Sequence, residues 1–500
     1  MSLYRAVLLA LAAVAAASAQ SLADFEKKVT EFTLPNGLHF IVLERHEAPV
    51  VSFHSYVNAG SVNDPSGETG IAHMFEHMAF KGTPQIGTTD YEAEKQAMDN
   101  VERIYDQYDE ERARGARADP AKLASLQAEL REAMKKANSY VVPNEFSEII
   151  EENGGVGLNA ETSVDATQYF YSLPSNRIEL WFLMEAERFA NPVFREFYKE
   201  RDVVREERRM RVESDPQGQL IESMQATAFE AHPYHVGAAG WASDIENFRL
   251  KEAVQFFREY YVPGNITIAI AGDVDPKQAR ELAEKYFGRI PAGPLPLGVR
   301  TVEPPQNGSK TVAVDSASQP LAILAWKRPN QNDKDDPVFD VISEILSSGR
   351  TSMLYTDMVR DKQIALAAQT TATFPGGKYP NLFLVLLAPN LGHTIAENEK
   401  ECYAVIDRLK SQKVDDETLT RVKTRLRAGV IRSLDSNEGL ASMLTFYYVN
   451  YGDWRKLLTG LDDIDHVGAD DVQRVARKYL VPETRTEAFI EAPAAQEEAK

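Results

Sequence analysis

The sequence predicts an α+β protein made of two similar halves, each of which combines strands with several helices. Its 500 residues are too many for one ordinary hydrophobic core. Residues 291–310 are rich in Pro and Gly and have the composition of a linker. The two halves also end alike, because "FFREYYVPGNITIAIAGD" resembles "RVARKYLVPETRTEAFIEA". In each, a helix that ends in Tyr precedes Val-Pro and a strand, which indicates two copies of one unit.

The first half starts with strand patterns and then alternates helices and strands. "FTLPNGLHFIVLE" predicts two short strands around a Pro-Asn-Gly turn, and "VVSFHSYVNAG" predicts a third. A helix is expected at 73–80, with Gly82 where it would stop. "GGVGLNAETSVDATQYFYSLP" returns to a β pattern. A buried helix at 178–189, a charged helix at 195–213, the strand "NITIAIAGDV" and the helix "KQARELAEKYF" complete this half.

Residues 91–139 differ in composition and are rich in Ala, Glu, Lys and Arg. Asp119-Pro120 lies near their middle, so we expect two long charged helices joined by a turn and inserted into the first domain. A solvated helix face explains this charge run better than a binding surface does. The predicted domains are therefore 20–290, with the insertion at 91–139, and 311–500, separated by the linker at 291–310.

The composition and the N-terminal sequence indicate which partners and which cellular location to expect. A formal net charge of -20 argues against a nucleic-acid partner, since phosphates would be repelled. "MSLYRAVLLALAAVAAASAQ" has an early cation, an apolar run and an Ala-Ser-Ala site, the pattern of a signal peptide at 1–19. A short N-terminal anchor is the alternative. Cys402 is the only cysteine, and an exported protein without disulfides fits a bacterial periplasm.

The stretch "GIAHMFEHMAFKGT" holds the strongest chemical signal. His73 and His77 are four residues apart, so on a helix both imidazoles can reach one ion. Glu76 lies between them in the order His-x-x-Glu-His, the inverse of the common metallopeptidase order, and can take a proton from water. Zinc suits these ligands best, although Mn or Co would fit too. The alternative is an ordinary helix surface.

A catalytic zinc site needs a third protein ligand, and the charged helix at 195–213 offers candidates. Glu200, Val204 and Glu207 follow the spacing i, i+4, i+7 of one helix face, with Val toward the core. Glu207 could then reach inward to the ion. Spacing alone leaves Glu206 and Glu196 open.

Together these segments resemble the M16 zinc metallopeptidases, the pitrilysin/insulysin and mitochondrial processing peptidase-like family. "HMFEH" followed by "MAFKGT" resembles their active-site helix, and the resemblance continues through "LNAETSVDATQYF", "YKERDVVREE", "HPYHVGAAGW" and "YYVPGNITIAIAGDVDP". It covers essentially the whole mature chain. It implies two homologous α/β-sandwich domains of the LuxS/MPP-like metallohydrolase fold, in the short two-chain (M16B-like) type.

The resemblance also implies roles for individual residues. One Zn²⁺ per chain would be held by His73, His77 and Glu207. Glu76 would be the general base, with Glu200 as a second acid beside the ligands. The family's strand edge that pairs with an extended peptide substrate falls on Asn159, Ala160 and Thr162.

Two departures from the family pattern matter. The interval between His77 and Glu207 is longer than usual, and the insertion at 91–139 accounts for the excess. Relatives also carry an Arg and, seven residues later, a Tyr that hold substrate. This chain keeps Arg360 but has Ala367 in place of the Tyr, so a phenol that could bind an oxyanion is absent. We therefore expect a heterodimer in which a second M16-like subunit supplies the Arg/Tyr pair.

The resulting interpretation is an exported zinc endopeptidase that hydrolyses peptides or short unfolded segments in a closed chamber. It would be the zinc-bearing subunit and would have no membrane span. A non-catalytic M16-like assembly subunit and a processing peptidase dedicated to one precursor are the alternatives. His232 and His235 in "AHPYHVG" are expected to have a structural or substrate-contact role rather than to bind metal.

Overall fold

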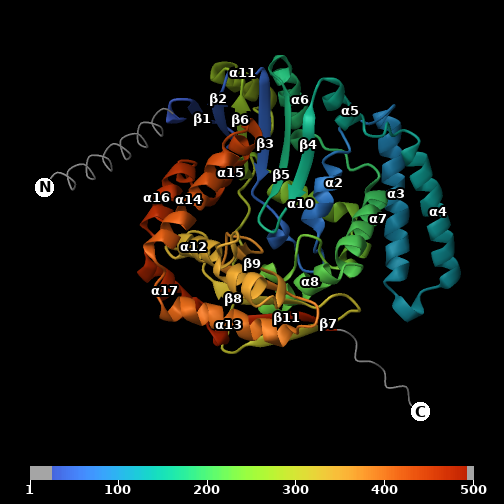
Figure 1. Ribbon diagram of the computed structural model, residues 1–500. Coiled ribbons are helices and arrows are strands. Elements are labelled where there is room, and N and C mark those ends of the chain that lie inside the picture. Colours follow the sequence, from blue (N-terminus) through green and yellow to red (C-terminus); the bar gives the residue numbers. More distant parts are fainter. Residues whose placement is uncertain (1–24, 492–500) are drawn as a thin grey trace, which may run out of the picture.

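The computed structural model describes residues 25–491, so the signal peptide expected at 1–19 lies outside the described residues. Figure 1 shows two separate sheets surrounded by helices, which confirms the predicted α+β class. The domain boundaries at 20–290, 291–310 and 311–500 stay a prediction. Within 25–491, no helix combines the length and apolar character that a membrane crossing needs.

The first sheet has six strands in the order β1-β2-β6-β3-β5-β4. β6 is parallel to β2, and the other pairs are antiparallel. Among the described residues, the outer strand β4 pairs only with β5, so its other edge is open. The strands are β1 (Val29–Thr33), β2 (His39–Glu44), β3 (Val50–Val57), β4 (Val156–Thr162), β5 (Thr167–Pro174) and β6 (Ile266–Gly272).

The second sheet has five strands in the order β7-β11-β8-β10-β9. Only the β11–β7 pair is parallel. The strands are β7 (Lys310–Asp315), β8 (Leu321–Arg328), β9 (Ala365–Phe374), β10 (Asn381–Pro389) and β11 (Arg485–Glu491).

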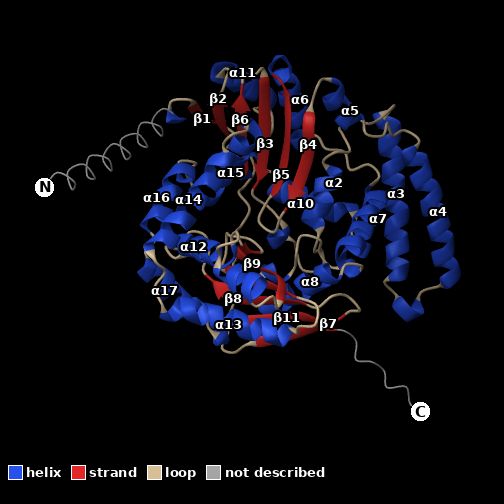
Figure 2. Cartoon of the chain, viewed as in Figure 1, coloured by secondary structure: helices blue, strands red, loops and turns tan. Residues whose placement is uncertain are grey.

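Helices pack around both sheets (Figure 2). Those that precede β7 are α2 (Ile71–Met78), α3 (Tyr91–Arg112), α4 (Pro120–Asn138), α5 (Glu145–Glu152), α6 (Ile178–Ala190), α7 (Phe197–Arg208), α8 (Pro216–Ala228), α9 (Ala242–Asn247), α10 (Leu250–Tyr260) and α11 (Pro276–Tyr286). Those that follow β8 are α12 (Asp336–Ser347), α13 (Ile395–Ser411), α14 (Asp416–Ser433), α15 (Asn437–Tyr451), α16 (Lys456–His466) and α17 (Ala469–Tyr479). Of these helices, α15 and α8 lie between the two sheets.

The predicted helical hairpin is confirmed as α3 and α4, which lie side by side at the right of Figure 1. Each helix begins at an aspartate whose side chain accepts a backbone N–H of the first turn: Asp90 for α3 and Asp119 for α4. Pro120 occupies the first position of α4, where its missing N–H costs nothing. Buried apolar residues of α3 and α4 tie the hairpin to the core of the first sheet.

The two halves share a core, because α15 from the second half packs on the first sheet. Leu440 and Leu444 of α15 contact a buried patch that includes Ile41 and Ala269 of the sheet. Apolar residues lie around most of α15, so its sequence does not show which sheet the helix will cover.

A buried network around Asp165 joins the halves at a second place. The Asp165 carboxylate accepts hydrogen bonds from the Tyr234 hydroxyl at 2.6 Å and from the Gly377 N–H at 2.9 Å. The Lys378 ammonium donates to the Asp165 carbonyl at 2.7 Å and also to the Asn58 side chain. Gly377 and Lys378 lie between β9 and β10, so this network fixes the second sheet against the loop between β4 and β5.

Candidate zinc centre

The helix α2 presents the three polar residues of "HMFEH" on one face. It begins after Gly70, whose φ of 94° suits glycine, and the Asp64 carboxylate accepts the N–H groups of Gly70 and Ala72 at 2.7 and 3.1 Å. The opposite face is buried in the core through Ile71, Ala72, Met74, Phe75 and Met78. His73, Glu76 and His77 are left half-buried on the face that meets α7.

The helix α7 brings Glu207 to both histidines. Val204 is fully buried and anchors the helix, as its spacing predicts. Glu207 Oε2 lies 3.7 Å from His73 Nε2 and 3.4 Å from His77 Nε2. The predicted helix at 195–213 ends earlier, at Arg208, and a π-helical turn follows at Arg209–Glu213.

The three donor groups fit a zinc ion. One atom from each of His73, His77 and Glu207 lies within 4.8 Å of the others. Zinc bonds of about 2.1 Å in tetrahedral geometry place ligand atoms roughly 3.4 Å apart, close to the separations seen here. Two imidazole nitrogens and one carboxylate oxygen are also the donor types of catalytic zinc sites. Glu206 and Glu196 are paired elsewhere, with Arg209 and with Lys81 and Lys199.

A carboxylate and a lysine support the second histidine. Glu200 Oε2 lies 3.6 Å from His77 Nδ1, the ring nitrogen that faces away from Glu207. The other Glu200 oxygen is 2.5 Å from the Lys81 ammonium. Although burial opposes the shift, the interactions with His77 and Lys81 lower the pKa of Glu200 to about 2. An ionised acceptor behind a ligand fixes the ring orientation and its tautomer.

Lys81 did not emerge from the sequence analysis as a functional residue. It lies four residues after His77, so helical spacing could have suggested it. Its ammonium also contacts Glu196 at 3.2 Å. Lys81 therefore links α7 to the end of α2 and keeps two acids near the histidines charged.

The protonation states of His73 and Glu76 also suit a metal site. Burial, together with the neighbouring His77, lowers the pKa of His73 to about 4, so its imidazole is neutral at pH 7 and has a free lone pair. Burial raises the pKa of Glu76, while a hydrogen bond with Thr162 opposes the shift. A carboxylate with a raised pKa is a better proton acceptor.

A cavity of about 560 Å³ opens beside Glu76 and His77. Asn159 of β4 lines it, and Thr162 of the same strand meets Glu76. Asn159 is exposed, and Ala160 and Thr162 are half-buried. The structure therefore brings Asn159 and Thr162 near the predicted base, along the open edge of β4 that also carries Ala160.

Other predicted residues lie apart from this cluster. Arg360 is exposed and pairs with its neighbour Asp361, and no described contact joins it to the histidines. Ala367 lies in the outer strand β9. His232 is buried beside Tyr234 and Tyr379, and His235 hydrogen-bonds the His232 carbonyl, so neither joins the metal cluster.

The loop "HPYHVGAAGW" supports the start of α2. The Thr69 hydroxyl donates to Asp244 at 2.7 Å and accepts the Trp241 N–H at 2.8 Å. Gly240 has a φ of 65°, and a Cβ at this position would lie 2.1 Å from the Thr69 carbonyl. Only glycine lets this loop approach α2 so closely, so the segment positions the helix that carries the histidines.

A histidine pair four residues apart on a helix, an acid just before the second histidine and a distant glutamate form the arrangement that inverted-motif metallopeptidases use. The chain belongs to peptidase family M16. The family model described as "Insulinase (Peptidase family M16)" matches residues 40–100 and 115–239, and that described as "Peptidase M16 inactive domain" matches 247–426.

Relatives match along most of the chain. "Zinc protease PqqE" of Helicobacter pylori is 28% identical over 472 residues, covering 92% of this chain and 91% of the relative. "Probable mitochondrial-processing peptidase subunit beta, mitochondrial" of Arabidopsis thaliana is 24% identical over 476 residues, covering 91% and 76%. The crystal structure of a protease from Helicobacter pylori has a TM-score of 0.77 at 26% identity and covers 93% of this chain and 99% of that one.

Proposed function

We propose that this chain is a zinc-dependent endopeptidase whose metal is held by His73, His77 and Glu207. The observation that carries the proposal is the convergence of these three donor atoms beside Glu76. Relatives named zinc proteases support the same chemistry. When bound, zinc supplies a Lewis acid that polarises a peptide carbonyl and makes water more acidic.

The protein's own groups would then move the proton. The Glu76 carboxylate takes a proton from the attacking water as the new C–O bond forms at the carbonyl carbon. It returns this proton to the leaving nitrogen as the C–N bond breaks, so the carboxylate is regenerated. Glu200 does not touch the substrate in this scheme and instead holds the His77 ring. Its part in catalysis would thus be one of positioning.

The open edge of β4 is the proposed substrate-binding edge. Asn159, Ala160 and Thr162 lie on this edge strand, and Asn159 and Thr162 are near Glu76. An extended peptide can pair there as an additional strand, which recognises backbone rather than particular side chains. Peptides or unfolded segments would bind better than folded proteins, because only an extended backbone can add to a sheet.

We further propose that the chain acts with a second M16-like subunit. It keeps Arg360 but has Ala367 where the family's Tyr is expected, and Arg360 has no described contact with the histidines. A partner that supplied the Arg/Tyr pair would complete a closed chamber around the substrate. The pattern at 1–19 supports export, with the bacterial periplasm as the proposed location.

One purification tests both parts of the proposal. The mature chain would be prepared alone and together with the product of a neighbouring gene, and zinc content and cleavage of a peptide library would be measured. We expect zinc in the chain alone but full cleavage only with the partner. Full activity of the chain alone would refute the heterodimer. Zinc without cleavage in any combination would favour a non-catalytic assembly subunit. Cleavage confined to one precursor would identify a dedicated processing peptidase.

A further inference from the structure

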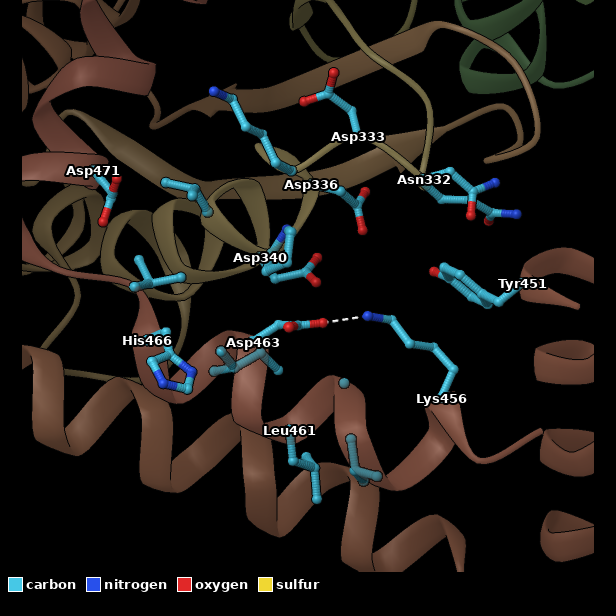
Figure 3. Close-up of a pocket in the computed structure, with 18 of the residues that line it drawn as sticks. Asn332, Asp333, Asp336, Asp340, Tyr451, Lys456, Leu461, Asp463, His466 and Asp471 are labelled. Carbon is cyan, nitrogen blue, oxygen red and sulfur yellow. Dashed lines mark hydrogen bonds and ion pairs between the residues drawn. The ribbon is translucent and has the colours of Figure 1, made fainter. Parts of the chain in front are cut away.

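The second half contains a cavity that the proposed peptidase function does not use. It has a volume of about 630 Å³ and lies between α12, the end of α15, α16 and the start of α17 (Figure 3). It shares no lining residue with the cavity at Glu76. Cavities of roughly 300–1,000 Å³ are the usual size of small-molecule sites.

The lining of this cavity is rich in acids. Five aspartates line it, against three lysine or arginine side chains and one histidine. Most charges already have partners: Lys456 pairs with Asp463, as the dashed line in Figure 3 marks, and Arg474 pairs with Asp471 at 3.1 Å. Lys334 is exposed at the rim. The cations of the wall therefore leave an excess of negative charge inside.

Asp340 is the unusual member of this set. Its carboxylate makes no hydrogen bond or ion pair with any residue in 25–491, and Figure 3 shows it directed into the cavity. Burial and the like charge of Asp336, one turn away on α12, raise the pKa of Asp340 to about 7. Asp340 is half-buried, and a carboxylate that has lost much of its solvent is more stable with a charged partner than without one. Asp336 itself pairs with Arg328.

Aromatic rings face these two acids. Tyr447 and Tyr451 are one turn apart on α15, and their rings stack with centroids 5.3 Å apart at 20°. Besides burial, the charges of Asp336 and Asp340 contribute to raising the pKa of both tyrosines, as expected for groups that face each other. The faces of aromatic rings attract cations, as carboxylates do.

The apolar side of the cavity and the distances between its carboxylates indicate which kind of cation fits. Leu457, Leu461 and Ile464 line the side formed by α16 and would contact an aliphatic stem. A metal ion would need several donor atoms close together. Within 25–491, the sole group of three or more such residues with donor atoms inside 4.8 Å is the one at His73. An organic cation, which is held by charge and by ring faces, does not need that convergence.

We propose that this cavity binds an alkylguanidinium or alkylammonium group, with its head between Asp340, Asp336 and the tyrosine rings and its stem toward α16. The cation could be a free small amine or the basic side chain of a peptide. Both present the same head and stem to the cavity. This site is independent of the zinc chemistry proposed above.

Calorimetric titration of the mature chain with two matched compounds tests the site. Pentylguanidinium carries the charge, and pentylurea has nearly the same shape without it. We expect saturable binding of pentylguanidinium and at least tenfold weaker binding of pentylurea. Equal binding of the two compounds, or no saturable binding of either pentylguanidinium or pentylammonium, would overturn the proposal. Full competition by Mg²⁺ or Ca²⁺ at stoichiometric concentrations would also overturn it.

Variants locate the site. Asp340→Asn should weaken pentylguanidinium binding at least tenfold, whereas Asp407→Asn, at an exposed aspartate of α13, should change it less than twofold. Because Asp340→Asn removes an unpartnered charge, its melting temperature should not fall. Should that variant fail to fold, Tyr451→Leu provides the same test through the ring face. Unchanged affinity in the folded variant would overturn the proposal.

A third compound distinguishes the two sources of the cation. Arginine capped at both ends presents the same head group as part of a peptide backbone. Binding as tight as that of pentylguanidinium would identify a peptide side chain as the ligand. Binding at least tenfold weaker would identify a free amine or guanidine, and either result supports the cation site.

Discussion

Replacing Glu200 by Gln should weaken zinc binding about tenfold. The substitution keeps the shape of the side chain but removes the charge that faces His77 Nδ1 at 3.6 Å and the Lys81 ammonium at 2.5 Å. Loss of such a supporting contact typically costs 10–100-fold in metal affinity. The distance to His77 is longer than that of an ordinary hydrogen bond, so we place the effect near the lower limit, or about 1.4 kcal/mol.

Competition with a fluorescent zinc chelator at pH 7.5 measures this effect. Glu206→Gln is the matched control, because Glu206 lies on the same helix but is exposed and pairs with Arg209. The control should change zinc affinity less than twofold. Both variants should unfold at the same denaturant concentration within error. If Glu200→Gln bound zinc as tightly as the control, Glu200 would have no part in holding His77 and this reasoning would be refuted.

Three further predictions concern catalysis and the contact between the halves. Glu76→Gln should keep its zinc and lose cleavage by about 10²–10⁴-fold in kcat, the usual contribution of a general base; retained cleavage would contradict this role. Tyr234→Phe leaves a buried Asp165 oxygen without its hydroxyl donor, so denaturant titration should show a loss of about 1–3 kcal/mol. A loss below about 0.5 kcal/mol would mean that the network around Asp165 is not a main link. Burial lowers the pKa of Lys378 from 10.5 to about 8. The unfolded chain therefore binds more protons between these values, and the stability of the wild type relative to Lys378→Met should rise with pH there, by about 1 kcal/mol or more from pH 7.5 to 9.5. A flat or falling difference would contradict the lowered pKa of this amine.

The sequence was sufficient for those parts of the site that are local. Helical spacing placed His73 and His77 on one face, and the position of Val204 placed Glu200 and Glu207 on one side of their helix. Local spacing did not select Glu207 over its acidic neighbours. Spacing allowed three acids, the family resemblance selected one, and the packing of α7 against α2 brings that one within 3.7 Å of both imidazoles.

Features that depend on long-range packing could not be predicted. One local feature also escaped prediction: the helix α2 begins at Ile71 rather than at 73, because the nearby Asp64 and Gly70 fix its first turn. No local pattern indicates that α15 will cover the first sheet. The network of Asp165, Tyr234 and Lys378 brings Lys378 to Asp165 across 213 positions, and no local pattern in the sequence indicates that these residues meet.

The zinc content of Glu207→Gln, compared with that of the wild type and Glu206→Gln, shows whether Glu207 is the third zinc ligand. Each protein would be dialysed against a weak chelator and analysed by mass spectrometry for metal. We expect close to one zinc per chain in the wild type and in Glu206→Gln, and a loss of most of the zinc in Glu207→Gln. Full zinc occupancy in a folded Glu207→Gln protein would contradict the three-ligand centre.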